Sequence, residues 1–121
     1  MSFDSLLEDL VATVYDSRGA IFLDNDGEVV QLHVVHKSLK ELDLIGAYHG
    51  ITLSSCRKFA DEIDMGDIDI MLCRYKNTTC LVKTLHAGYF VLLALGPQGN
   101  IGQAIYKLKD VAEKLNIEMG I

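Results

Sequence analysis

The sequence has no tryptophan, one proline and three cysteines in 121 residues. Cys56, Cys73 and Cys80 form an odd set without the spacing of zinc ligands, so we expect free thiols in a reducing compartment. No apolar run reaches the roughly 18 residues that a membrane span needs, and no basic-then-apolar leader opens the chain. These absences predict a cytoplasmic protein that does not insert into a membrane.

Basic residues are scarce, with 11 lysines and arginines against 17 aspartates and glutamates, and a net charge of −6. An acidic chain without a stripe of basic residues repels a phosphate backbone, so nucleic acid is not an expected partner. Hydrophobic residues make up 50% of the chain and recur along its whole length, which predicts a folded core. The length fits one domain, residues 1–121.

Side chains that bind metals do not gather in a recognised pattern. The histidines lie in different segments: His33, His36, His49 and His86. Of these, His49 is expected to face the core and to be hydrogen-bonded there. Acidic residues gather in one stretch, at Asp61, Glu62, Asp64, Asp67 and Asp69. Their spacing does not fit a calcium-binding loop, so we expect a solvated acidic turn and no metal site.

Glycines at positions 96, 99 and 102 lie between an expected strand and an expected helix, as glycines do in phosphate-binding loops. The segment lacks both the Gly-Lys-Ser/Thr motif and the G-x-G-x-x-G spacing, so we expect a plain turn and no cofactor. No local signature marks a Cys-His nucleophile pair, and we expect no enzyme. An enclosed cavity lined by histidine and cysteine would instead favour an enzyme or a small-ligand carrier.

The first third of the chain predicts a helix and a hairpin. Residues 4–16 place leucines and valines at helical spacing. The candidate caps for this helix are Ser2, Asp4 and Ser5. Residues 19–24 and 28–35 are rich in branched and aromatic side chains and predict two strands. The Asn-Asp-Gly turn at residues 25–27 favours a hairpin between them.

Residues 39–64 predict the longest helix, because Ser38 and Glu41 fit a capping box at its start. Residues at a spacing of about 3.6 form its expected core side: Leu42, Ile45, His49, Leu53, Cys56, Phe59, Ala60 and Ile63. A second row lies on a different side of the same helix: Leu44, Tyr48, Ile51 and Ser55.

The rest of the chain predicts strands joined by short turns, which makes them antiparallel. The expected strands are residues 67–75, 79–85 and 89–95. The last of them is apolar on both faces and is therefore expected at the centre of the sheet. A final helix follows the break at residues 96–99, with Asn100 as its cap and Gln103 completing a capping-box variant.

The order helix, two strands, long helix, three strands, helix predicts an antiparallel sheet with helices on its faces. In two segments, GAIFLDNDGEVV (19–30) and YFVLLALGPQGNIGQAIYKLKDVAEKL (89–115), the chain resembles the roadblock/dynein light chain family. The resemblance implies an α+β fold with a five-stranded antiparallel sheet in the order α-β-β-α-β-β-β-α. One long helix would cover one face of the sheet and two helices the other. Profilin-like and longin domains are related folds of similar size that the same order of elements would also fit.

The resemblance also implies a function. Roadblock domains commonly form dimers through their third strands, and they regulate or carry Ras-like small GTPases. A short bacterial member is the GTPase-activating partner of a polarity GTPase in gliding motility. We therefore expect a homodimer that binds a Ras-like small GTPase and stimulates GTP hydrolysis. The alternative is a dimeric adaptor that leaves nucleotide turnover unchanged.

Two features of the residues themselves favour a dimer. The row Leu44, Tyr48, Ile51 and Ser55 would leave large apolar groups in water in a single copy, unless it belongs to a wide core-facing stripe. The third strand, with Ile68, Ile70 and Leu72, would be an apolar sheet edge unless another element covers it. Arg57 and Lys58 on the long helix are candidate GTPase contacts, although surface charges of this kind also serve solubility.

The segment 76–77 is a candidate two-residue turn. With such a turn, Cys73 and Cys80 face each other across the hairpin, at a spacing that permits a disulfide under oxidation. We nevertheless expect both to be thiols in the cytoplasm.

Overall fold

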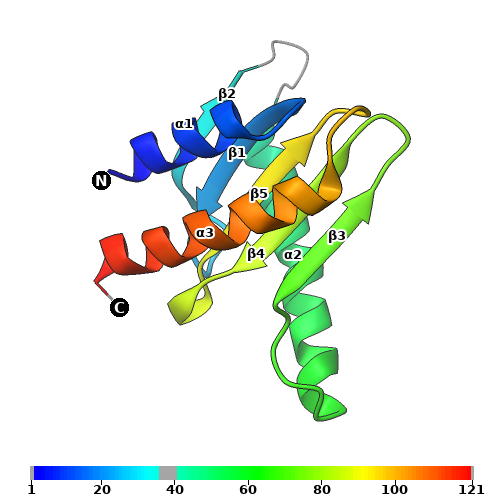
Figure 1. Cartoon of the computed structure of the whole chain (residues 1–121). Helices are drawn as coiled ribbons and strands as arrows, with labels where there is room; N and C mark the ends of the chain where they lie inside the picture. Colours follow the sequence, from blue (N-terminus) through cyan, green and yellow to red (C-terminus); the bar gives the residue numbers. More distant parts are fainter. Residues whose placement is uncertain (1, 36–40, 121) are drawn as a thin grey trace.

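The strand with apolar residues on both faces, β5 (Phe90–Leu95), lies at the centre of the sheet. The computed structural model describes residues 2–35 and 41–120. Within them the strand order is β2-β1-β5-β4-β3, and every neighbouring pair is antiparallel (Figure 1). All six residues of β5 are buried, because helices cover both faces of the sheet there. The predicted central position is confirmed.

The elements follow the predicted order α-β-β-α-β-β-β-α. The other strands are β1 (Ser17–Leu23), β2 (Val29–Val34), β3 (Ile70–Arg74) and β4 (Thr79–Thr84). The helices are α1 (Phe3–Thr13), α2 (Leu42–Glu62) and α3 (Ile101–Met119), with a short 3-10 helix η1 (His86–Gly88) before β5. The predicted fold class is therefore confirmed. Among the described helices, none combines the length and the apolar character needed to cross a membrane.

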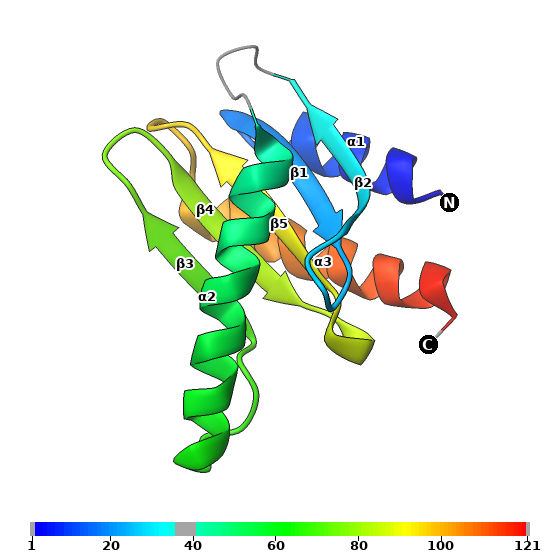
Figure 2. The ribbon, with the colours of Figure 1, turned by 180° about the vertical axis from the view of Figure 1, so that it is seen from behind.

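Helices cover both faces of the sheet (Figures 1 and 2), and an apolar core lies under them on each face. On one face, α1 and α3 pack side by side over β1, β5 and β4, with Phe22 at the centre between the rings of Phe3 and Tyr89. On the other face, α2 alone covers the sheet, with Leu42 and Leu53 against the strands. Successive residues of a strand point to opposite faces, so each strand contributes to both cores.

Two glycines let α2 approach the sheet closely. A Cβ atom on Gly46 would lie 3.1 Å from the Leu23 side chain, and one on Gly50 would lie 2.8 Å from Cζ of Phe90. Glycine costs a helix about 1 kcal/mol relative to alanine. Here that loss accompanies a close contact of the helix backbone with β1 at Gly46 and with β5 at Gly50.

The start of α2 differs from the prediction. The helix begins at Leu42, three residues later than expected. Its N-cap is Glu41, whose backbone is left-handed (φ 58°) and whose side chain makes no capping hydrogen bond. Ser38, the predicted cap, lies outside the described residues.

The far end of α2 also differs. Phe59 and Ile63 were predicted to face the core, yet they are 60% and 45% exposed. The last turns of α2 extend past the ends of the strands (Figure 2), so no strand lies beneath them. The helical period alone assigned these residues to the buried side. That prediction was wrong because the buried side is narrow: at 100° per residue, Phe59 lies about 110° and Ile63 about 70° from the centre of the buried residues, toward the exposed side.

The N-caps of the two helices that pack together follow the sequence closely. Ser2 caps α1 and exchanges hydrogen bonds with Ser5. Asn100 caps α3 by accepting a hydrogen bond from the backbone N–H of Gln103. The predicted return bond from the Gln103 side chain is wrong. Its Oε1 accepts from the N–H of Tyr15 and its Nε2 donates to the carbonyl of Thr13, which joins α3 to the end of α1.

The β3–β4 hairpin has the predicted two-residue turn. The N–H of Tyr75 donates to the carbonyl of Thr78 at 2.8 Å, which leaves residues 76–77 between the strands. Cys73 pairs with Cys80 in the register, as predicted, and both are free cysteines.

Candidate functional site

The outer side of α2 carries an exposed apolar row. Leu44 is 46% exposed, Tyr48 and Ile51 are each 63% exposed, and Ser55 is exposed as well. At 100° per residue, this row lies about 150° around the helix from the buried residues. The buried residues are Leu42, Gly46, His49, Leu53 and Ala60. The row is therefore not part of a wide core-facing stripe, and its role as an interface stays a prediction.

β3 forms one edge of the sheet. Its backbone pairs with β4 on one side, and no strand of residues 2–35 or 41–120 pairs with the other. Leu72 pairs with Leu81, which belongs to the core under α1 and α3, so Ile70 and Leu72 point away from α2. Ile68 is half-buried against the core under α2. The predicted interface residues thus flank the edge on both faces of the sheet.

We call the outer side of α2 together with the edge strand β3 the α2–β3 surface. It contains exposed apolar residues that the sequence analysis did not assign to it: Phe59, Ile63 and Tyr75. Phe59 continues the spacing of Leu44, Tyr48, Ile51 and Ser55 by one further helical turn, and this signal was available from the sequence. Tyr75 points to the same face as α2 because it follows Cys73 at the strand period of two.

An open groove of about 470 Å³ lies between α2 and the β3–β4 hairpin. Ile45, Tyr48 and His49 line it from the helix, and Tyr75 and residues 76–78 line it from the hairpin, with Cys80 at its base. The rings of His49 and Tyr75 meet edge to face at 5.8 Å. The groove is therefore the apolar part of the α2–β3 surface that lies next to the end of β3.

His49 is held on both ring nitrogens, as expected for a core histidine. Nδ1 lies 2.7 Å from the carbonyl oxygen of Ile45, and Nε2 lies 2.8 Å from the hydroxyl of Tyr75. A carbonyl only accepts, so in the neutral ring Nδ1–H donates to Ile45 and Nε2 accepts from Tyr75. Burial, followed by the neighbouring cysteines, raises the pKa of Tyr75, which keeps the donated proton on the hydroxyl.

The groove contains histidine and cysteine, the combination that would favour an enzyme in an enclosed cavity, but it is open. Burial, with a smaller contribution from Cys73, raises the pKa of Cys80 to about 11. A nucleophilic cysteine needs a lowered pKa and a base that is free to take its proton. Cys80 has the opposite shift, and the ring of His49 already has two partners.

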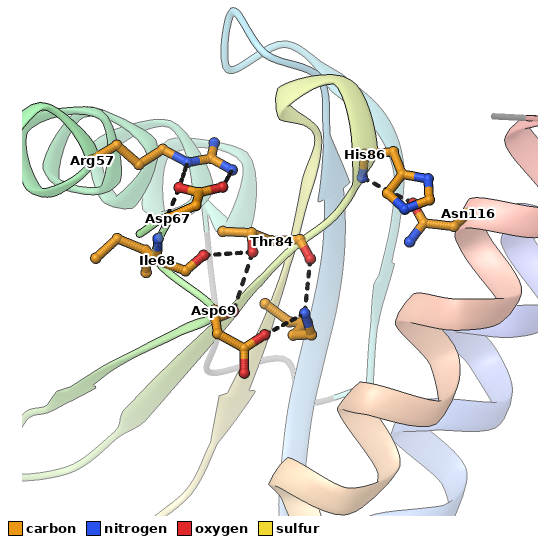
Figure 3. Close-up of polar contacts among 8 residues, drawn as sticks. Arg57, Asp67, Ile68, Asp69, Thr84, His86 and Asn116 are labelled. Carbon is orange, nitrogen blue, oxygen red and sulfur yellow. Dashed lines mark hydrogen bonds and ion pairs between the residues drawn. The ribbon is translucent and has the colours of Figure 1, made fainter. Parts of the chain in front are cut away.

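The acidic turn after α2 is tied to the fold by ion pairs (Figure 3). Nε and Nη2 of Arg57 donate to the two carboxylate oxygens of Asp67 at 2.8 and 3.0 Å. Nζ of Lys83 donates to Asp69 at 2.8 Å. The hydroxyl of Thr84 donates to the carbonyl of Ile68 at 2.7 Å. Arg57 is thus a partly buried structural side chain, whereas Lys58, the other predicted GTPase contact, is exposed.

These pairs give a pH prediction. The hydrogen bond from Arg57, against a smaller opposing effect of burial, lowers the pKa of Asp67, and the hydrogen bond from Lys83 lowers the pKa of Asp69. A carboxylate whose pKa is lowered in the folded protein stabilises the fold when the pH is above its pKa in the unfolded chain, which is 3.8 for aspartate. This stabilisation is lost as the pH falls from that value through the lower pKa of the folded protein. The melting temperature of Asp67→Asn/Asp69→Asn should therefore fall less than that of wild type between about pH 6 and about pH 3.

Circular dichroism during heating measures this difference. Both carboxylates are well exposed, so the effect is small. The matched variant Asp61→Asn/Asp64→Asn removes the same formal charge from the same acidic segment. Its melting temperature should fall with pH as much as that of wild type. Equal losses in all three proteins would show that these ion pairs do not stabilise the fold.

The glycine-rich turn before α3 binds a carboxylate of the chain itself. Asp16 accepts a hydrogen bond from the N–H of Gln98 at 2.9 Å and pairs with Nε of Arg18 at 3.1 Å. Its backbone carbonyl accepts from the N–H of Gly96. A Cβ atom on Gly96 would collide with the Asp16 carboxylate, so the glycine serves this contact. The turn is the strand-to-helix connection that the sequence predicted.

Solved structures with this architecture cover nearly the whole chain. A Roadblock/LC7 domain from Streptomyces avermitilis superimposes with a TM-score of 0.88 at 20% identity, over 100% of both chains. The gliding protein MglB from Thermus thermophilus gives 0.83 at 15% identity, over 93% of this chain and 84% of that one. MglC from Myxococcus xanthus gives 0.70 at 24% identity, over 98% and 99%. No family model and no curated protein matches the sequence.

Proposed function

We propose that this chain, which has the Roadblock/LC7 fold, forms a homodimer that binds a Ras-like small GTPase and stimulates its GTP hydrolysis. The observation that carries the proposal is the α2–β3 surface, which combines an exposed apolar row with an open sheet edge. The chain acts as a binding module in this proposal and performs no chemistry of its own.

The dimer removes two unfavourable features at once. Tyr48 and Ile51 are exposed side by side on α2, and burying apolar area contributes about 25 cal/mol per Å². The outer edge of β3 presents backbone N–H and C=O groups to water beside apolar side chains, an arrangement that favours pairing with another strand. A second copy related by a two-fold axis would supply an identical edge in the antiparallel direction.

The GTPase part of the proposal draws on the likeness to MglB and on the resemblance of the two sequence segments to the roadblock family. Arg57, the one arginine in α2, is engaged in the ion pair with Asp67, so the proposal does not assign it as an arginine finger. Stimulation would instead come from ordering the switch loops of the GTPase, which exist in ordered and disordered states. Lys58 is the exposed basic side chain on α2 that would contact the GTPase.

Phosphate release with purified Ras-like GTPases from the same genome tests this proposal. With the cognate GTPase, the hydrolysis rate should rise above the intrinsic rate of that GTPase. Lys58→Glu should weaken the complex, whereas Lys109→Glu, an exposed site on α3 across the sheet, should not. A rate that none of these GTPases raises would contradict the proposed stimulation.

The adaptor is the second candidate, and the ion pair of Arg57 favours it because α2 then offers no arginine to the nucleotide. An adaptor would bind the GTPase as the same dimer and leave the hydrolysis rate unchanged. Binding measured by calorimetry, together with an unchanged rate of phosphate release, would identify this case.

A further inference from the structure

The last turns of α2 form an apolar and acidic projection. Phe59 in its last turn, and Ile63 and Met65 just after it, are 60%, 45% and 73% exposed, where the helix extends past the sheet (Figure 2). Acidic side chains alternate with them, at Asp61, Glu62 and Asp64. The projection is held in place, because Arg57 on the helix binds Asp67 in the segment that leads to β3. It is therefore a fixed knob beside the start of β3.

The groove between α2 and the β3–β4 hairpin has the complementary character. It is mostly apolar, and among the described residues that line it Lys76 is the one with a full charge. At about 470 Å³ it has room for a phenylalanine and an isoleucine side chain together. It lies beside the end of β3, since Tyr75 and Lys76 directly follow that strand.

The knob and the groove of one copy cannot meet, because α2 and β3 run in opposite directions and place them at opposite ends of the strand (Figure 2). A two-fold axis next to the β3 edge changes this. It sets two β3 strands antiparallel, so the start of one strand lies beside the end of the other. The knob of each copy then lies next to the groove of its partner.

We propose that in the homodimer Phe59 and Ile63 of each copy fill the groove of the other, between Tyr48 on α2 and Tyr75 on the hairpin. The acidic residues of the knob then lie close to Lys76, which matches opposite charges across the contact. This inference rests on the proposed dimer and adds which residues meet in it. By symmetry the contact occurs twice, so each groove is complete only with the partner present.

The charge pattern and the apolar lining favour a second copy over a small ligand. A small-molecule site usually adds a few converging polar groups that orient its ligand. In this groove both nitrogens of His49 are occupied and the Tyr75 hydroxyl donates its hydrogen bond to His49, so neither offers a free hydrogen-bond donor to a ligand. The apolar side chains of the knob match the apolar lining of the groove, and its acidic residues match the charge of Lys76.

Cross-linking tests the contact. In Ile63→Cys/Asn77→Cys, one thiol is on the knob and the other on the turn beside the groove, at opposite ends of β3 in one copy. Mild oxidation should convert most of the chains into covalent dimers on a non-reducing gel. Ile63→Cys and Asn77→Cys alone give the background, which includes the natural cysteines. Ile63→Cys/Asn25→Cys, with its second thiol in the turn between β1 and β2, should not exceed that background.

Light scattering on the same samples separates the two proposals. A dimeric mass with cross-linking above background supports both. A dimeric mass with cross-linking at background overturns the knob-and-groove contact and leaves the dimer standing. A monomeric mass at micromolar concentration overturns the dimer and, with it, this contact.

Discussion

Leu44→Asp/Ile51→Asp is expected to be a monomer at concentrations where the wild-type protein is a dimer. Both side chains lie in the exposed row of α2, so aspartate there does not enter the core of the single copy. In a dimer, each substitution would bury an unpaired carboxylate against the partner, and the contact occurs twice by symmetry. A loss of about 2 kcal/mol at each of two central interface positions adds up to about 4 kcal/mol, which raises the dissociation constant by about 1000-fold.

Multi-angle light scattering over a range of concentrations measures the change. Tyr106→Asp/Ile117→Asp is the matched control, because these residues are 72% and 77% exposed on α3, on the other face of the sheet. The control should keep the wild-type mass. Both variants should still fold, with a melting temperature equal to that of the wild-type chain as a monomer. A wild-type protein of one-chain mass, or a dimeric Leu44→Asp/Ile51→Asp, would contradict the prediction.

Gly50→Leu is expected to lower the free energy of unfolding by about 2 kcal/mol. A Cβ atom at this position would lie 2.8 Å from Cζ of Phe90, whose ring is 3% exposed and has little room to move. Overpacking a filled core typically costs about 1–3 kcal/mol, and more where the backbone has to shift. The higher helix propensity of leucine returns up to about 1 kcal/mol. The clash therefore outweighs the gain in propensity.

Urea unfolding measured by circular dichroism gives this difference from the midpoint and the slope. Ser54→Leu, one turn further along α2, is the matched control because Ser54 is exposed. It gains helix propensity without a clash, so it should equal or slightly exceed wild type in stability. If Gly50→Leu were as stable as Ser54→Leu, the close approach of α2 to the sheet would not depend on the glycine.

The local parts of the fold were accessible from the sequence. The apolar run of β5 predicted its central position, because a strand covered on both faces needs no alternation. Residues 76–77 predicted the turn that sets Cys73 opposite Cys80, since loop length fixes the register of a hairpin. Asn100 predicted the start of α3 through its capping side chain. Each of these signals acts within a few residues of the structure that it determines.

The errors concern contacts between distant segments. Phe59 and Ile63 lie at the margin of the helix side that faces the core, and the fold covers Ala60 between them but leaves both exposed. Gln103 has the right position for a capping box, yet Thr13 and Tyr15 offer its amide better partners from 90 and 88 residues away. Such choices depend on the assembled fold. The sequence therefore predicted the central residues of the candidate site, on α2 and β3. It did not predict Phe59 and Ile63 at the end of α2, or Tyr75 beside the groove.

The strand order has a consequence for how the chain folds. β1–β2 and β3–β4 are both local hairpins, yet β5, which follows them in the sequence, is inserted between β1 and β4. Before β5 is synthesised, each hairpin has an unpaired inner strand, and neither hairpin touches the other in the sheet. Isolated two-stranded hairpins are marginal in water. A nascent chain therefore cannot complete its sheet until residues 90–95 have left the ribosome, and the step that closes it joins segments about seventy residues apart.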